Sequence, residues 1–342
     1  MRAPPGDGSR WRACSPRLHG ATGRGSDLRI LDVMKSGRPV VPSGGDVAGV
    51  TAAGNPWLER RVLAYAHQGG AWEAPSSTLY AIRAALASGS TAVELDVHAT
   101  ADGELVVCHD ATVDRTTDGT GAIAAMTLAE LRTLDNAYWF VPGSDATAGL
   151  APSHYPFRGR APADPDFRIP TLREVLEQFP GVLLNLDVKQ TAPVVEPYEE
   201  ALARLLAEFQ RRDDVIVASF FDEATERFAT FAPDVPTSAG MATTAEFWRS
   251  VQAGDPVAPA LATASRRPVA FQVPEVYGEV TVVDRRFVDA AHAAGVAVHV
   301  WTVDDEASMR ELVRLGVDGI ITDVPTVLSR VLAQLDASWK GR

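Results

Sequence analysis

Three carboxylates lie at positions where they could act together on one cation. Glu94 and Asp96 stand two residues apart in the run VELDVH, and Asp187 stands in the run LLNLDVK. Carboxylate oxygens are the preferred ligands of hard divalent cations, and clustered carboxylates are costly to bury without one. The pattern therefore favours a metal site, although the same acids could instead pair with Lys189 and nearby arginines as a structural network.

Two histidines stand at the ends of apolar runs. His67 follows VLAYA, and His109 closes the run ELVVCH, directly before an aspartate. Histidine titrates near neutral pH, so two histidines beside a metal would supply a general acid and a general base. A lone histidine is more often a packed or capping residue, and it is the shared placement at strand ends that favours catalysis. Trp301 ends a further strand, where it can line a pocket or belong to the core.

Predicted strands and helices alternate along the chain, which indicates parallel βα units. Helix–glycine–strand units recur, as in FVDAAHAAG before VAVHVWTV and SMRELVRLG before VDGIITD. In VELDVH, Val93, Leu95 and Val97 share one face of the strand, while the two acids and His98 share the other. Polar faces on two strands favour a TIM (β/α)₈ barrel with polar residues at its C-terminal mouth over an open, doubly wound sheet.

The predicted barrel occupies residues 57–335. Residues 1–56 are rich in Gly, Pro, Ser and Arg without sustained periodicity, and we expect them to form a disordered extension. Residues 135–168 are rich in aromatic residues, proline and glycine and interrupt the strand–helix rhythm. We expect this segment to be a loop-rich insertion over the C-terminal mouth.

Composition limits the partners. The chain has 32 Lys and Arg against 44 Asp and Glu, a net charge of −12, which argues against nucleic-acid binding but permits a small phosphorylated substrate beside a local cation. The two cysteines, Cys14 and Cys108, imply no disulfide framework and favour a cytoplasmic setting. No apolar run approaches transmembrane length, so we expect no stable membrane anchor. The oligomeric state stays open.

Four stretches together resemble the glycerophosphodiester phosphodiesterase family. They are AHQGG…APSST, VELDVHATADGELVVCHDATVDRTTDGTG, LLNLDVK and VHVWTVDDEASMRELVRLGVDGIITDVP, in the family's order from about Leu63 to Pro325. The resemblance implies a TIM barrel, a divalent metal (commonly Ca²⁺ or Mg²⁺) and hydrolysis of glycerophosphodiesters to glycerol 3-phosphate and an alcohol. The residues it implies are the metal ligands Glu94, Asp96 and Asp187, the acid/base pair His67 and His109, and the substrate contacts Gln68, Lys189 and Trp301.

The chain departs from the family pattern at three positions. Gln68 replaces an arginine that helps to bind phosphate, and its amide can donate hydrogen bonds but no charge. Ser76 replaces a glutamate, and Glu73 is the nearby acid that could take its place. Asp187 is one methylene shorter than the glutamate usual there. These departures bear on the substrate and the rate more than on the type of chemistry.

The glycines after His67 have an expected role as well. Gly69 and Gly70 would let the backbone approach a metal-bound phosphate closely. Ser76 or Ser77 would cap the helix that follows.

Two other functions remain open on the sequence. A lysophospholipase D-type phosphodiesterase could use the aromatic insertion for an acyl chain, although the same rings could simply pack over the barrel; they are Trp139, Phe140, Tyr155 and Phe157. A catalytically weak phosphodiester-binding protein would fit the departures at Gln68 and Ser76.

Overall fold

The computed structural model describes residues 54–262 and 267–341, and residues 1–53 of the expected extension lie outside them. The strands are β1 (Leu63–His67), β2 (Ala92–Ala99), β3 (Leu105–Val107), β4 (Leu183–Val188), β5 (Val215–Ala218), β6 (Ala270–Pro274), β7 (Val276–Tyr277), β8 (Val280–Thr281), β9 (Ala297–Trp301) and β10 (Gly319–Thr322). The α-helices are α2 (Leu79–Ala87), α3 (Leu128–Leu131), α4 (Leu172–Gln178), α5 (Glu199–Glu208), α6 (Asp222–Phe231), α7 (Met241–Ala253), α8 (Ala258–Leu261), α9 (Arg285–Ala293), α10 (Glu306–Leu315) and α11 (Pro325–Gln334). The 3-10 helices are η1 (Pro56–Leu58), η2 (Ile123–Ala125), η3 (Pro152–His154) and η4 (Pro165–Phe167).

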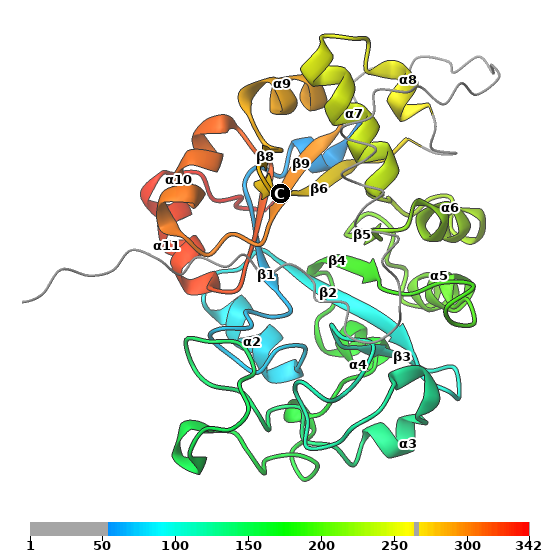
Figure 1. Ribbon diagram of the computed structural model, residues 1–342, viewed down its shortest axis with the longest axis vertical. Helices are drawn as coiled ribbons and strands as arrows, with labels where there is room; N and C mark the ends of the chain where they lie inside the picture. Colours follow the sequence, from blue (N-terminus) through cyan, green and yellow to red (C-terminus); the bar gives the residue numbers. More distant parts are fainter. Residues whose placement is uncertain (1–53, 263–266, 342) are drawn as a thin grey trace, which may run out of the picture. The chain divides into compact units, whose positions relative to one another are not determined.

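Parallel strands close into a barrel. The strands β5, β4, β2, β1, β10, β9 and β6 are hydrogen-bonded in that order. Thr237 and Ser238 close the remaining gap, because they form parallel bridges to Val217 of β5 and Ala270 of β6. Figure 1 shows the helices outside these strands. The predicted TIM barrel is therefore confirmed, with a two-residue segment in place of one regular strand.

The alternation predicted for the strands is observed. Val93, Leu95 and Val97 of β2 belong to one buried apolar cluster with Leu184 and Leu186 of β4. Residues of α4 and α5 complete this cluster, so the outward faces of the strands are covered by helices. The opposite faces of β2 and β4 point into the barrel, and the polar residues on them are held close together there.

The barrel interior changes from apolar to polar along its axis. Trp57, Leu63 and Tyr65 belong to a buried cluster formed by residues from the beginnings of the strands. One step further along, the amides of Asn185 and Gln272 form two hydrogen bonds to each other, at 3.0 and 2.7 Å. The charged residues come last, at the C-terminal ends, where a TIM barrel carries its active site.

Residues before the predicted barrel also contribute to its N-terminal end. The side-chain amide of Asn55 donates hydrogen bonds to the carbonyl oxygens of Val269 (2.7 Å) and Gly295 (2.9 Å). The Asn55 side chain also accepts a bond from the backbone of Trp57 at 3.1 Å. Asn55 therefore fixes the backbone at the start of the barrel, and Trp57, two residues later, is fully buried.

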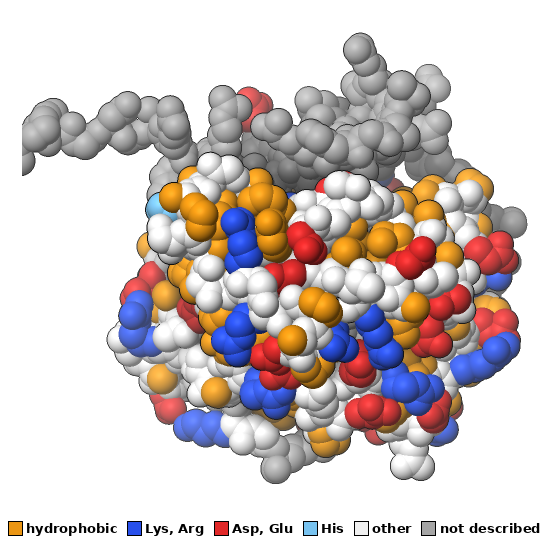
Figure 2. All heavy atoms as spheres, turned by 90° about the horizontal axis from the view of Figure 1, so that it is seen from below, with side chains coloured by type: hydrophobic (Ala, Val, Ile, Leu, Met, Phe, Trp, Pro, Cys, Tyr) orange, Lys and Arg blue, Asp and Glu red, His pale blue; other side chains and the backbone are white. Residues whose placement is uncertain are grey.

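Acidic and basic side chains are intermixed on the face drawn in Figure 2. Elsewhere in the structure, many charges are paired locally, for example Arg83 with Asp166 and Arg132 with Glu174, both at 3.2 Å. In the part of the chain that the structure describes, no helix is both long and apolar enough to cross a bilayer.

Candidate active site

His67, the last residue of β1, is oriented by a carboxylate from the other end of the chain. Its Nδ1 lies 2.6 Å from Oδ1 of Asp323, which directly follows β10, the neighbour of β1. Its Nε2 lies 3.2 Å from the amide nitrogen of Gln68 and 3.8 Å from Oε2 of Glu94. Because an ionised carboxylate only accepts hydrogen bonds, Asp323 fixes the proton on Nδ1, and the unprotonated Nε2 then accepts from the amide of Gln68.

Asp323 is itself held in place by a second aspartate. The carboxylate of Asp304 accepts hydrogen bonds from the backbone of Asp323 (2.7 Å) and from the hydroxyl of Thr322 (2.9 Å). Neither aspartate was predicted as a site residue from the sequence. Asp323 carries a signal that could have found it, because it continues the inward row of Gly319 and Ile321 past the end of β10.

His109 has a carboxylate partner of its own, from the next residue. Its Nδ1 lies 2.6 Å from Oδ1 of Asp110, and its ring centroid lies 6.4 Å from that of His67. His98, on β2, supports the backbone here, because its Nε2 lies 3.3 Å from the carbonyl oxygen of His109. The structure thus brings the two predicted histidines together, each with its own aspartate.

The three predicted metal ligands also come together. Asp96 and Asp187 are register partners on β2 and β4, and Glu94 lies one inward step earlier on β2. The ammonium of Lys189 lies 3.1 Å from Oδ1 of Asp96 and 3.3 Å from Oδ2 of Asp187. The other oxygen of each aspartate, Oδ2 of Asp96 and Oδ1 of Asp187, is buried and has no hydrogen-bond partner among the described residues.

Burial and mutual repulsion perturb this group strongly. Burial and the nearby Asp96 raise the pKa of Glu94 to about 8, and burial likewise raises the pKa of Asp187. Burial would also raise the pKa of Asp96, but the charge of Lys189 holds it below its ordinary value. Burial lowers the pKa of His67, yet Asp323, Glu94 and Asp96 together raise it to about 10. One ammonium therefore does not balance the negative charge of the three acids.

Among the described residues, no group of three or more His, Cys, Asp or Glu side chains has the arrangement of a preformed metal site. In this arrangement Lys189 contacts Asp96 and Asp187, while His67 lies near Glu94. The donor set nevertheless fits a hard divalent ion, because two buried carboxylate oxygens lack a partner and the acids outnumber the single ammonium.

The loop after His67 needs its glycines for packing. Gly69 and Gly70 have φ angles of +85° and +93°, and a Cβ atom on either would lie 2.7 Å from Ala81 or from Pro325, respectively. Only glycine adopts this conformation readily and lets α2 and α11 approach so closely. The expected contact of these glycines with phosphate stays a prediction.

The expected cap of α2 is wrong by one or two residues. The N-cap is Thr78, whose hydroxyl accepts a hydrogen bond from the backbone of Ala81 at 3.1 Å. Ser77 adopts a φ of +55° and belongs to the preceding turn, where its N–H donates to the carbonyl oxygen of Gln68 at 2.8 Å.

Glu73 has a different role from the one considered for it. Its carboxylate accepts hydrogen bonds from the backbone (3.1 Å) and the hydroxyl (2.7 Å) of Thr326, in the first turn of α11. The acid therefore caps a helix and does not replace the glutamate whose place Ser76 takes.

Trp301, at the end of β9, lies beside an aromatic residue that the sequence analysis missed. Its ring centroid is 5.6 Å from that of Phe220, which follows β5, and the Phe220 ring lies 5.8 Å from the ammonium of Lys189. Phe220 is 39% exposed. The two rings form an apolar wall next to the charged group.

The rings of the insertion are largely used for packing. The ring centroid of Phe157 lies 5.0 Å from that of Tyr80 on α2, while Phe140 and Tyr155 are only 3% and 5% exposed. The guanidinium of Arg158 lies 3.6 Å from the centre of the Tyr155 ring. Phe140 and Tyr155 are therefore used for packing, whereas Trp139 and Phe157 stay partly exposed, and the use of these rings by an acyl chain stays a prediction.

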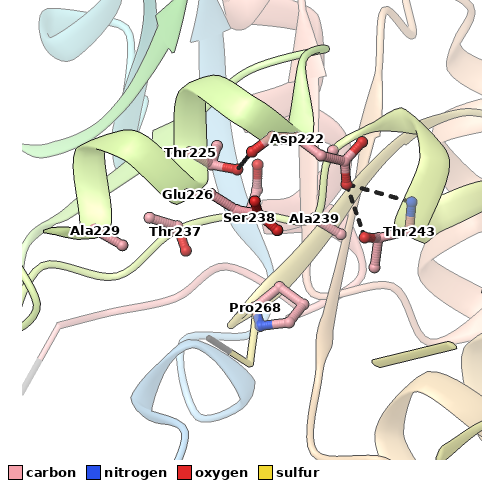
Figure 3. Close-up of a pocket in the computed structure, with 10 residues that line it drawn as sticks. Asp222, Thr225, Glu226, Ala229, Thr237, Ser238, Ala239, Thr243 and Pro268 are labelled. Atoms are coloured by element: carbon pink, nitrogen blue, oxygen red, sulfur yellow. Dashed lines mark hydrogen bonds between the residues drawn. The ribbon is translucent and has the colours of Figure 1, made fainter. Parts of the chain in front are cut away.

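The cavity drawn in Figure 3 lies apart from the histidines and acids. Its volume is about 20 Å³, enough for roughly one water molecule. The carboxylate of Asp222 accepts hydrogen bonds there from the hydroxyl (2.7 Å) and the backbone (3.3 Å) of Thr243, so it caps α7. No residue predicted for the active site lines it.

Comparisons with known proteins agree with the motifs and the fold. The model of the glycerophosphoryl diester phosphodiesterase family matches residues 67–327. A glycerophosphodiester phosphodiesterase of Caldanaerobacter subterraneus subsp. tengcongensis is 31% identical over 275 residues, which cover 78% of this chain and 96% of that protein.

Solved structures share the fold. A putative glycerophosphoryl diester phosphodiesterase from Silicibacter pomeroyi has a TM-score of 0.65 at 23% identity, covering 84% of this chain and all of the other. An Oleispira antarctica phosphodiesterase in complex with the product sn-glycerol-3-phosphate has a TM-score of 0.57 at 25% identity, covering 80% and 96%. The resemblance is thereby confirmed, and the chain belongs to the glycerophosphoryl diester phosphodiesterase family, whose members are phosphoric diester hydrolases.

Proposed function

We propose that this protein hydrolyses a glycerophosphodiester to glycerol 3-phosphate and an alcohol, with His67 as general base and His109 as general acid. The observation that carries the proposal is the pair of histidines, 6.4 Å apart between ring centroids and each hydrogen-bonded to its own aspartate. The Oleispira relative, which was solved with sn-glycerol-3-phosphate, supports the choice of product.

The two histidines would move protons at opposite ends of the displacement. Nε2 of His67 takes the proton of the attacking oxygen, from water or from the glycerol 2-hydroxyl, as that oxygen bonds to phosphorus. The bond from phosphorus to the leaving oxygen then breaks, and that oxygen takes the proton from Nε2 of His109. With water as the nucleophile, one water molecule is consumed for each diester cleaved. With the 2-hydroxyl, water opens the cyclic phosphate in a second displacement.

Asp323 and Asp110 would keep both rings in the required tautomer. Each aspartate accepts from Nδ1 at 2.6 Å, which leaves Nε2 as the nitrogen that exchanges the proton. A charge-assisted hydrogen bond of this length also restricts ring rotation.

A divalent cation, Ca²⁺ or Mg²⁺, would be held by Glu94, Asp96 and Asp187. Their uncompensated charge and the two unpartnered buried oxygens support this assignment. When bound, such a cation supplies positive charge next to the phosphate oxygens and stabilises the transition state. It also offsets the field of the acids at His67, which favours the neutral imidazole that a general base requires.

Lys189, Gln68 and Trp301 would bind the substrate. Lys189 supplies the fixed positive charge for the phosphate, and the amide of Gln68 can donate a hydrogen bond. Trp301 and Phe220 offer an apolar wall for the carbon chain of the glycerol. A cytoplasmic setting is part of the same proposal and rests on the low cysteine count, with Cys108 buried and free.

Glycerol 3-phosphate release from glycerophosphocholine tests the proposal. His67→Ala and His109→Ala should each lower kcat by roughly 10²- to 10⁴-fold, the usual contribution of a general acid or base. His154→Ala, which removes an exposed histidine of the insertion, is the matched control and should leave kcat unchanged. Wild-type turnover of lysophosphatidylcholine alone would favour the lysophospholipase D function instead, and binding without turnover would favour the weak phosphodiester-binding protein.

A further inference from the structure

A continuous series of charged contacts joins the insertion to His109. We infer that Asp145, in the insertion, is a positioning residue that acts through Arg115 and Asp110 on the His109 ring; this rests on the proposed role of His109 as general acid. The insertion, which packs on the loop after β1 and on α2, would then also help to orient His109.

The guanidinium of Arg115 is shared by two carboxylates. Its Nε and Nη2 donate to Asp110 at 2.8 and 3.1 Å, and its Nη1 donates to both oxygens of Asp145 at 2.7 and 2.8 Å. Oδ1 of Asp110 accepts from Arg115 and from His109 at once. The orientation of the His109 ring therefore depends on where Arg115 holds this carboxylate.

Asp145 is well fixed as the outer end of this series. Its carboxylate accepts from the backbone of Ala146 at 2.7 Å, and its carbonyl oxygen accepts from the hydroxyl of Thr147 at 2.9 Å. Two residues earlier, the N–H of Gly143 donates to the carbonyl oxygen of Trp72 at 2.8 Å, in the loop that follows His67. The insertion is thus tied to both sides of the active site.

Partial burial makes these charged contacts effective. The side chains of His109, Asp110 and Arg115 are 34%, 30% and 28% exposed. Water therefore screens the Arg115–Asp110 contact less than a surface ion pair, while Asp145, at 45% exposure, is the most solvated member of the series. Without Asp145, Nη1 of Arg115 would lose its carboxylate partner. The guanidinium would then move more freely and would fix the position of Asp110 less well.

Two substrates with different leaving groups can show whether Asp145 positions His109 or only maintains the overall structure of the site. Choline leaves glycerophosphocholine as an alkoxide and needs the proton of His109, whereas p-nitrophenol leaves the p-nitrophenyl ester of glycerol 3-phosphate as a stable anion. Asp145→Asn should therefore lower kcat for glycerophosphocholine by roughly 3- to 30-fold, the scale of coupling through a contact network, with KM unchanged. The aryl ester should be turned over at nearly the wild-type rate.

His109→Ala separates the inference from the proposed function. It should show the same dependence on the leaving group with a larger loss, and Asp145→Asn should add nothing in the His109→Ala background. If His109→Ala affects both substrates equally, the proposed role of His109 fails. If His109→Ala behaves as expected but Asp145→Asn affects both substrates equally, or adds its full loss in the double variant, the inference about Asp145 fails.

Two further variants control for folding. Asp164→Asn removes a comparable ion pair of the insertion, with Arg160 at 3.1 Å, and should leave both substrates unaffected. If Asp145→Asn does not fold, Arg115→Lys replaces it. Lysine keeps the positive charge but lacks the forked guanidinium that binds both carboxylates. Arg115→Lys is then combined with His109→Ala in the same double-mutant cycle. An Arg115→Lys variant with wild-type turnover of glycerophosphocholine would overturn the inference.

Discussion

At the residue scale, each proposed acid–base histidine is governed by an aspartate on its Nδ1. The alternation of polar and apolar residues predicts the inward acids of β2 and β4. The ends of apolar runs predict the histidines, and His67 does end β1. His109 does not end a barrel strand, because it comes after Val107, the last residue of the short strand β3, which is antiparallel to β2. The partner of His67 could not be predicted in the same way, because Asp323 is 256 residues away and reaches it only where β10 lies beside β1. Sequence spacing contains no information about that contact until the order of strands is known.

A buried histidine gives a prediction that does not depend on catalysis. In the described part of the chain, both ring nitrogens of His299 lack a hydrogen-bond partner, and burial lowers its pKa to about 4. The unfolded chain binds a proton near pH 6.5 and the folded chain only near pH 4, so stability should decrease as the pH falls through this window. The loss should total about 3 kcal/mol at pH 4 and below.

Urea unfolding of wild type and His299→Leu between pH 7 and pH 4 measures this effect. The variant should lose less stability on acidification by about 3 kcal/mol. His154→Leu, at an exposed position, should keep the wild-type dependence on pH. Equal pH dependence in wild type and His299→Leu would show that His299 titrates normally in the folded protein.

At the element scale, the proposed site residues lie on strands or directly after them: His67 ends β1, Glu94 and Asp96 lie on β2, and Lys189 follows β4. Periodicity predicts the longer strands and helices, and it also predicts the inward row that contains Trp301. It could not predict the barrel segment at Thr237 and Ser238, because two residues are too few to show any period. The cap of α2 was misplaced for a local reason, since Ser77 is used in a left-handed turn instead.

Gly70 tests the link between a loop and a helix. Its φ of +93° resembles the +83° of Gly103, but only at Gly70 would a Cβ atom meet a neighbour, the ring of Pro325 at 2.7 Å. Gly70→Ala should therefore destabilise the protein by about 1–3 kcal/mol more than Gly103→Ala, the usual cost of overpacking. Denaturant unfolding of both variants measures the difference, and equal losses would mean that only backbone strain matters at these positions.

At the scale of the whole molecule, the apolar cluster and the residues proposed for catalysis lie at opposite ends of the barrel. Apolar residues fill the N-terminal end, an amide pair spans the middle, and charged residues occupy the C-terminal end. The unpartnered oxygens of Asp96 and Asp187 lie only in the charged part, while the fully buried Trp57 closes the opposite end. The sequence predicts part of this polarity, because in β1 and β4 a polar or charged residue follows the apolar ones, at His67 and Asp187.

Trp57 tests the role of the closed end. Trp57→Ala should cost about 3–5 kcal/mol, the range for removing a large ring from a core. Trp248→Ala, at a half-buried position on α7, is the control and should cost less. If Trp57→Ala is at least as stable as Trp248→Ala, the stability of the barrel does not depend on the buried Trp57 ring.

The proposal that three buried acids hold a divalent cation required for hydrolysis has one most direct test. It is the release of glycerol 3-phosphate from glycerophosphocholine. Protein stripped of metal by a chelator should release none, and Ca²⁺ or Mg²⁺ added back separately should restore release. Glu94→Gln should need far more metal for the same rate, because it removes one of the three ligand charges. Undiminished release by the stripped protein, or none with any added cation, would contradict the account.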